Sequence, residues 1–463
     1  MKHPITLPLM TIALMAQCAF SDVKPNIIFI MADDMGYGQV GCYGQEMIQT
    51  PRLDQMAREG LRLTDYYSGT TVCAPSRCSL MTGLHVGHTF IRGNVEIKAT
   101  ATTESGQLPI PDSTITVAEK MKEAGYATGL VGKWGLGYPM SEGDPLNQGF
   151  DFFAGYNCQR RAHNYYPGWV WRNHDKVELG AKDTPEGYSH YFMTREARSF
   201  ITEHKDQPFF LYLAYTIPHA QLQIPSSDAA YKLYADKDWP DAQKKHAGMI
   251  SLMDRDIGGI LDLLKELSLD KNTLVVFTSD NGPHKEGGAK PEFFDDNGPL
   301  RGIKRDMYEG GMREPFIARW PGVIEAGRVS DHIAAHWDFM STACELAGVP
   351  PPTDIDGISY VPLLKNDMAR QKDHRYVYFE LHHPDRRGVR MGDWVAVQQT
   401  TTSLNPEQNP TELFNLKNDL GETTDLAAQY PEKTDELKKL FIEAHAPSER
   451  FEFKAKKTNK KKK

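Results

Sequence analysis

The sequence is poor in cysteine, in long apolar runs and in net positive charge. It has six cysteines among 463 residues and no pair of CxxC motifs, so neither a cysteine-ligated zinc site nor a disulfide framework is indicated. It has 53 Lys and Arg residues against 61 Asp and Glu residues, and seven of the lysines lie in 454–463. The body of the chain is therefore acidic, which argues against nucleic acid as its main partner.

The longest apolar run lies at the N-terminus and predicts a leader rather than a membrane span. Residues 1–21 begin with Lys2 and His3, continue through an apolar stretch interrupted by Pro8, and end in "AFS". We expect cleavage before Asp22 and export to the periplasm or the medium. Cys18 raises the alternative of a lipoprotein, which Gln17 disfavours. At the other end, residues 451–463 are expected to form a disordered Lys-rich tail.

The five cysteines beyond the leader differ in their surroundings. Four of them are expected to be ordinary packing residues, with one incidental disulfide left open: Cys42, Cys78, Cys158 and Cys344. Cys73 stands in "VCAPSRCSLMTG", where Pro75 suits a first helical turn. A cysteine at a helix N-terminus is expected to have a lowered pKa and to be reactive.

Apolar runs and amphipathic stretches alternate through most of the chain. This pattern predicts an α/β fold, with a large, mixed but mostly parallel sheet sandwiched by helices. Strands are expected at 26–31, 126–132, 208–216 and 272–279, with helices ending at Gly125 and spanning 242–267. We place the catalytic domain at 22–364. A smaller C-terminal α+β subdomain with a short antiparallel sheet is expected at 365–450.

Polar side chains follow each of the predicted parallel strands. In open α/β sheets, ligands bind beyond the carboxyl ends of the strands. The residues at these ends are Asp33 and Asp34, Lys133, His219, and the group Asp280, Asn281 and His284. Asp and Asn are also common in plain turns, but two such groups at like positions favour a hard cation, Ca²⁺ or alternatively Mg²⁺.

Several cationic and titratable residues have the character that an anionic substrate requires. Lys133, Lys304 and Arg77 could bind oxyanions, while His219 and His284 could transfer protons near neutral pH. Each of them alone would be read as a surface charge or a structural histidine. A hard-metal site is a poor environment for a thiolate, which suggests that an oxygen nucleophile acts in place of Cys73.

"CAPSRCSLMTG" matches the pattern C-x-P-S-R-x4-T-G and resembles the signature of the Cys-type sulfatases, relatives of alkaline phosphatase. Further segments resemble this family in the family's order, and the likeness covers nearly the whole mature chain. They are "PNIIFIMADDMGYGQVGCYG", "GLVGKWGLG", "TSDNGPH", "LRGIKRDMYEGGMREPFIARWPG" and "ELFNLKNDLGETTDLA".

The resemblance implies a sulfuric ester hydrolase with an alkaline-phosphatase-like fold. It implies that a formylglycine-generating enzyme oxidises Cys73 to formylglycine, whose hydrate attacks sulfur while held on Ca²⁺. The calcium ligands would be residue 73 together with Asp33, Asp34, Asp280 and Asn281. Arg77 would steady the hydrate, Lys133 and Lys304 would hold the sulfate, and His219 would protonate the leaving oxygen.

The chain departs from the family pattern at two positions. Gly135 in "GKWGLG" stands where a histidine that handles the formylglycine hydroxyl is common. His284 or a water would have to take over that function. Gln39 stands where an aspartate is common, and we regard this difference as minor.

The substrate is expected to be a sulfated saccharide. The aromatic run "GYNCQRRAHNYYPGWVWRNH" suggests a sugar pocket, although such clusters are also typical of a core. Its candidate substrate contacts, beside His284, are Arg160, Arg161, His163 and Asn164. The segments resemble bacterial polysaccharide sulfatases, and we expect galactose or N-acetylgalactosamine, sulfated at O4 rather than O6. The alternatives are a phosphonate or phosphate ester hydrolase and a catalytically silent glycan binder.

Overall fold

The protein is described by a computed structural model, covering residues 24–453 apart from 102, 383–384, 400–402 and 404. The predicted leader and residues 454–463 of the predicted tail lie outside the described residues. Phe451 and Phe453 are buried, at 3% and 7% exposure, so the folded chain runs past the expected start of the tail. All five cysteines beyond the leader are free. Among the described helices, none is long and apolar enough to cross a membrane.

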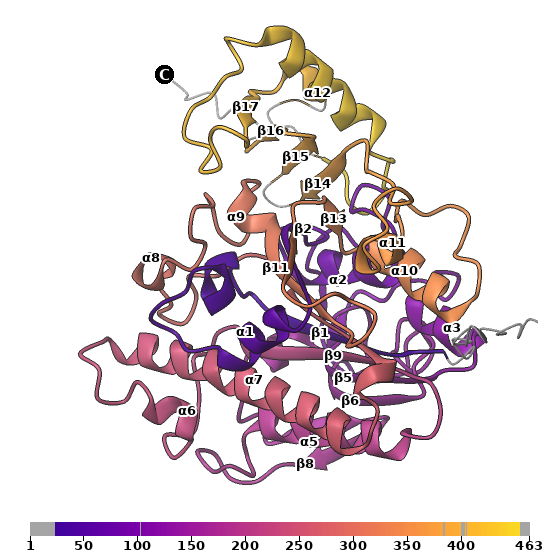
Figure 1. Cartoon of the computed structure of the whole chain (residues 1–463), viewed down its shortest axis with the longest axis vertical. Helices are drawn as coiled ribbons and strands as arrows, with labels where there is room; N and C mark the ends of the chain where they lie inside the picture. The colour runs from indigo at the N-terminus through magenta and orange to yellow at the C-terminus, as the bar shows by residue number, and fades with distance from the viewer. Residues whose placement is uncertain (1–23, 102, 383–384, 400–402, 404, 454–463) are drawn as a thin grey trace, which may run out of the picture.

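A large mixed sheet forms the body of the molecule (Figure 1). Its order is β12-β2-β11-β10-β1-β9-β5-β6-β7-β8, with β13 also paired to β2. The strands are β1 (Asn26–Asp33), β2 (Leu61–Tyr67), β5 (Ala127–Lys133), β6 (Phe152–Tyr156), β7 (Trp169–Arg172), β8 (Asp175–Glu178), β9 (Phe209–Pro218), β10 (Thr273–Ser279), β11 (Arg313–Arg319), β12 (Arg328–Ser330) and β13 (Ala334–Ala335). From β10 through β1, β9 and β5 to β6, every pairing is parallel.

Helices cover both faces of this sheet, as the alternating pattern predicts. One face carries α1 (Pro51–Arg58), α5 (Ser189–Glu203) and α7 (Asp241–Glu266), and the other carries α2 (Cys73–Thr82), α3 (Val117–Glu123) and α10 (Asp338–Ala347). Along β1, Ile28 and Ile30 enter the first layer, while Ile27 and Phe29 enter the second. Burial on both faces explains why the strand is a continuous apolar run.

Shorter elements connect these layers. They are α4 (Gln159–Ala162), α6 (Ala229–Lys232), α8 (Pro291–Phe294), α9 (Glu309–Met312), α11 (Val361–Leu364), the ribbon of β3 (Glu96–Ile97) and β4 (Gly106–Gln107), and 3₁₀ turns at Tyr37–Gln39, Gly41–Tyr43, Asp270–Asn272 and Pro406–Gln408. The α3 helix begins with a capping box, in which Thr116 and Glu119 bond each other's backbone N–H at 3.2 and 2.7 Å.

A small antiparallel sheet and one helix form the C-terminal part, at the top of Figure 1. Its elements are β14 (Val377–Leu381), β15 (Arg386–Met391), β16 (Trp394–Gln398), β17 (Glu412–Asn415) and α12 (Pro431–Glu443). They match the strands and the helix expected there, and the fold class is confirmed. The expected boundary at 364/365 falls directly after α11 and remains a prediction.

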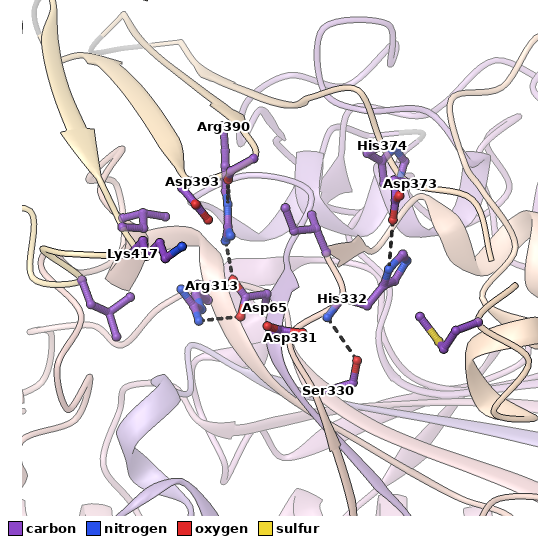
Figure 2. A pocket seen from close by; sticks show the side chains of 15 residues that line it. Asp65, Arg313, Ser330, Asp331, His332, Asp373, His374, Arg390, Asp393 and Lys417 are labelled. Carbon is purple, nitrogen blue, oxygen red and sulfur yellow. Dashed lines mark hydrogen bonds and ion pairs between the residues drawn. The ribbon is translucent and has the colours of Figure 1, made fainter. Parts of the chain in front are cut away.

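A polar cavity of about 790 Å³ lies between the two sheets (Figure 2). Asp65 of β2 projects into it and bonds both Arg313 of β11 and Arg390 of β15. The cavity lining includes no residue of the predicted metal or catalytic set. The Asp65–Arg390 pair connects the small sheet to the large one, and the Asp65–Arg313 pair lies within the large sheet.

Candidate active site

The carboxyl ends of four adjacent strands bring the predicted residues to one edge of the large sheet. Asp33 ends β1 and Lys133 ends β5, while His219 and Asp280 directly follow β9 and β10. Because these strands are parallel neighbours, their ends share that edge. The side chains meet in the interior, since all four residues are at most 1% exposed.

Three carboxylates and an amide form the acidic part of the site. The Asp34 N–H donates to Asp280 Oδ1 at 3.0 Å, and Asn281 Nδ2 donates to Asp34 Oδ1 at 2.7 Å. Asp34 adopts a left-handed backbone conformation with φ of 61°, which turns the chain directly after β1. Burial and the neighbouring Asp33 carboxylate raise the pKa of Asp280.

Cys73 opens α2, as predicted, and its Sγ lies 3.8 Å from Asp34 Oδ1. The expected low pKa of its thiol is wrong. Burial raises the pKa to about 12, against the opposing effect of Lys133 and Lys304 and with a further rise from Asp280. Complete desolvation disfavours a thiolate more than the helix N-terminus favours it. An unmodified Cys73 would therefore be a poor nucleophile.

Arg77 and Lys133 hold the carboxylates from one side. Arg77 Nε and Nη2 donate to Asp280 Oδ2 at 3.0 and 2.7 Å, and its Nη1 donates to the Lys133 carbonyl at 2.8 Å. Lys133 Nζ donates to both oxygens of Asp33 at 2.9 and 2.8 Å. Such fully buried cations are fixed in position by their charge partners.

Lys304 and His219 lie on the other side, against Asp34. Lys304 Nζ is 2.5 Å from Asp34 Oδ2 and 3.0 Å from His219 Nε2. His219 Nδ1 faces the Ala220 carbonyl at 2.6 Å, so Nδ1 carries the ring proton and Nε2 accepts one from Lys304. Burial, together with Lys304 and Lys133, lowers the pKa of His219, although Asp34 acts in the opposite direction. The ring is thus neutral here.

The residues present fit a hard divalent cation. Ligand atoms of Asp33, Asp34, Cys73 and His219 lie within 4.8 Å of one another. Asn281 Oδ1 is buried and has no hydrogen-bond partner among the described residues, so a strong oxygen donor is left for a cation. Carboxylate and amide oxygens are the ligands that Ca²⁺ and Mg²⁺ prefer.

The space beside Gly135 is occupied by Gln159, which the sequence did not indicate. Gly135 has φ of +86°, and a Cβ built on it would lie 2.8 Å from Gln159 Nε2. That Nε2 is buried and finds no partner in the described part of the chain. Gln39 is buried, accepts from Gly36 N at 2.8 Å and lies 3.3 Å from His246 Nε2.

The predicted substrate contacts fall into two groups. His163 stacks on His219, with ring centroids 4.0 Å apart, and is half-buried at the site. The other three of its segment make local contacts: Arg160 pairs with Glu96, Arg161 stacks on Trp169 and bonds the Pro167 and Trp169 carbonyls, and Asn164 bonds the Tyr166 backbone. A substrate function for them remains a prediction.

His284 lies close to the site but is 1% exposed. Its Nε2 donates to the Pro218 carbonyl at 3.3 Å, and its Nδ1 accepts from Glu286 N at 3.0 Å. Both ring nitrogens are thus used to hold backbone. Glu286, which no sequence motif indicates, also lies at the site, and its side chain is 34% exposed beside Lys304 and His219.

Comparisons with known proteins show the family to which the chain belongs. The Sulfatase family model matches residues 25–349, and the model for the C-terminal part of N-sulphoglucosamine sulphohydrolase matches residues 302–446. The N-acetylgalactosamine-6-sulfatase of Rattus norvegicus is 33% identical, over 94% of this chain and 87% of its own length. The Homo sapiens steryl-sulfatase is 32% identical, over 77% of this chain and 72% of its own length.

Solved structures of sulfatases resemble the chain over most of its length. Ps i-CgsB in complex with k-i-k-neocarrahexaose superimposes with a TM-score of 0.79 and 28% identity, covering 91% of this chain and 93% of that one. A sulfatase of glycosaminoglycan metabolism by Bacteroides thetaiotaomicron superimposes with a TM-score of 0.74 and 25% identity. The match covers 91% of this chain and 99% of that one. The phosphonate monoester hydrolase of Agrobacterium radiobacter, at 19% identity and a TM-score of 0.64, shares the fold. The chain belongs to the sulfatase family and is a sulfuric ester hydrolase.

Proposed function

We propose that the protein removes sulfate from a galactose or N-acetylgalactosamine residue of a sulfated polysaccharide or its oligosaccharides. The observation that carries this proposal is the burial of Cys73 among three carboxylates, two lysines and an arginine. This arrangement suits an anionic ester and an oxygen nucleophile, and it disfavours a thiolate.

Oxidation of Cys73 to formylglycine by a maturation enzyme would supply the nucleophilic oxygen, and a Ca²⁺ ion on Asp33, Asp34, Asp280 and Asn281 would supply positive charge beside it. Lys133 and Lys304 bind the sulfate oxygens and stabilise charge that develops on them. Arg77 donates to the Asp280 carboxylate and to the Lys133 carbonyl, so it fixes the positions of these two residues relative to each other.

His219 protonates the departing sugar oxygen. Its Nδ1–H is anchored on the Ala220 carbonyl, and its Nε2 accepts a proton from Lys304. The negative charge of a bound sulfate ester favours protonation of Nε2 from solvent, and the imidazolium passes that proton to the oxygen as the S–O bond breaks. The alcohol leaves neutral, and His219 returns to the neutral ring with its proton on Nδ1.

The sulfate position is the open part of the proposal. The sequence favours O4, whereas the rat relative is named for a 6-sulfate. Both positions are therefore tested on the same sugar. Export also remains a prediction, because the predicted leader lies outside the described residues.

The test measures sulfate release from the 4- and 6-sulfates of galactose and N-acetylgalactosamine, with the matching phosphates beside them. We expect release from at least one sulfate ester and none from a Cys73→Ala variant. Mass spectrometry of the peptide containing residue 73 should show the exchange of H₂S for O. Preference for phosphate would favour the phosphoryl hydrolase, and binding without release would favour the silent binder. Full activity with an unmodified thiol would refute the mechanism.

A further inference from the structure

We propose that Glu286 is a specificity-determining residue. It restricts the site to sugars that carry no second negative group close to the scissile sulfate. The inference rests on the proposed function, because it assigns the open side of the site to the sugar. Its basis is the position of one carboxylate relative to the sulfate-binding cations.

Glu286 lies where the buried site meets solvent. Its Oε2 is 3.9 Å from His219 Nε2, and its Oε1 is 3.9 Å from Lys304 Nζ. The Glu286 side chain is 34% exposed, whereas those of His219 and Lys304 are 1% and 3% exposed. Because His219 delivers the proton to the leaving oxygen, the sugar bonded to that oxygen must lie within reach of this carboxylate.

The carboxylate is held in place from two directions. His284 accepts from the Glu286 N–H at 3.0 Å and donates to the Pro218 carbonyl, which ties this loop to the end of β9. Arg305 Nη2 donates to Oε1 at 2.9 Å. A group fixed in this way keeps its charge at one place when a substrate arrives.

Glu286 is ionised at neutral pH. Burial raises the pKa of its carboxyl, but Lys304 and Arg305 outweigh this and lower the pKa below its usual value. A carboxylate accepts hydrogen bonds from sugar hydroxyl groups and repels a second sulfate or a uronic carboxylate. At separations of a few ångströms near a protein surface, such repulsion amounts to about tenfold in rate.

The test compares one sugar with one or two sulfates. The matured, Ca²⁺-loaded enzyme is assayed on N-acetylgalactosamine 4-sulfate, 6-sulfate and 4,6-disulfate. We expect kcat/KM for the better monosulfate to exceed that for the disulfate about tenfold. In Glu286→Gln, which removes the charge and keeps the shape, the ratio should fall toward one. Glu292→Gln, an equal charge change at an exposed position of α8, should keep the wild-type ratio.

Thermal unfolding of Glu286→Gln is compared with that of the wild type, and an equal midpoint shows that the substitution leaves the fold intact. An unchanged ratio in an active Glu286→Gln enzyme overturns the inference and leaves the proposed function standing. An equal fall of kcat on both kinds of substrate also overturns it, and indicates that Glu286 only positions Lys304. If the wild type releases sulfate from none of the three compounds, the same comparison is made with galactose 4-sulfate, 6-sulfate and 4,6-disulfate. Failure on both sugars overturns the proposed substrate class itself.

Discussion

The guanidinium of Arg390, in β15, lies 2.5 Å from the carboxylate of Asp65, in β2, and this contact joins the small sheet to the large one (Figure 2). Asp65 also accepts from Arg313 at 2.8 Å, and Arg390 donates to the Tyr67 hydroxyl. The side chains of Arg390 and Asp65 are 8% and 7% exposed, so their charges are shielded from water. If the charge of Arg390 is removed, the Asp65 carboxylate stays buried with only one of its two cationic partners.

Arg390→Met should therefore lower the free energy of unfolding by about 3 kcal/mol. Urea denaturation followed by fluorescence measures this change. Arg370→Met is the matched control, because Arg370 is 75% exposed and 3.7 Å from Asp367. Its effect should stay below about 0.5 kcal/mol. Equal effects of the two substitutions would contradict the assigned function of the Arg390 contact.

The sequence predicts the strand ends better than it predicts what surrounds them. Asp33, Lys133, His219 and Asp280 could be placed together because parallel neighbours share an edge. Each of these residues follows or ends a short, mostly apolar run, so its strand can be recognised from the neighbouring sequence alone. β2 and β11 carry half-buried or charged residues and pair antiparallel, so no local pattern predicts that they continue the same sheet beyond β10.

The remaining differences come from tertiary packing. The low pKa expected for Cys73 followed from its helix start, but the depth of burial depends on residues far along the chain. Gln159 begins α4 and Glu286 lies in the loop after β10, and neither periodicity nor spacing indicates that these two side chains reach the site. The predicted contacts Arg160 and Arg161 lie on the same segment as His163, yet one short helix turns them elsewhere.

Substitution at Gly135 tests whether Gln159 matters to the site. Gly135→Ala places a Cβ 2.8 Å from Gln159 Nε2 and strains a backbone with φ of +86°. Gly125→Ala imposes the same strain at φ of +83° with nothing within 4 Å. Both should lose about 1–2 kcal/mol of stability. Only Gly135→Ala should lower kcat/KM, and equal activities in the two variants would exclude a contribution of Gln159.

Loss of the acid at His219 should depend on the leaving group. His219→Asn is expected to reduce kcat on a sugar sulfate by about 10²–10³-fold, because an alkoxide leaves poorly without a proton. On 4-nitrophenyl sulfate the reduction should be much smaller, since nitrophenolate leaves as an anion. His174→Asn, at a side chain that is 45% exposed, serves as the control. Equal losses on both substrates would indicate that His219 acts only in binding.

Binding of Ca²⁺ should stabilise the folded enzyme. At a free concentration one hundred times Kd, the ion would add about 2.7 kcal/mol to the free energy of unfolding. Thermal unfolding with Ca²⁺ and with EGTA measures the shift, and Asn281→Ala should reduce it by removing the unpartnered Oδ1. Asp206→Asn, which alters a carboxylate that is 86% exposed, should leave the shift unchanged. A shift unaffected by Asn281→Ala would place the ion elsewhere.

Acid should destabilise the C-terminal subdomain through Glu380. This carboxylate is fully buried in β14 and bonds Arg92, His382 and His445 at 3.1, 3.0 and 2.7 Å. Burial raises its pKa, but His382, His445 and Arg92 together lower it well below the usual value. The folded form thus keeps its charge after the unfolded chain has begun to bind a proton.

Because the folded pKa is the lower one, the stability that Glu380 contributes is fully present above the unfolded pKa of about 4.3. It is lost as the pH falls from there toward the folded pKa. We therefore expect the free energy of unfolding to fall more steeply with decreasing pH in the wild type than in Glu380→Gln. Denaturation measured at intervals of about one pH unit, from about pH 6 to about pH 3, tests this. Glu443→Gln, which removes a carboxylate that is 46% exposed, should retain the wild-type slope. Parallel acid limbs for wild type and Glu380→Gln would mean that other carboxylates control the acid response.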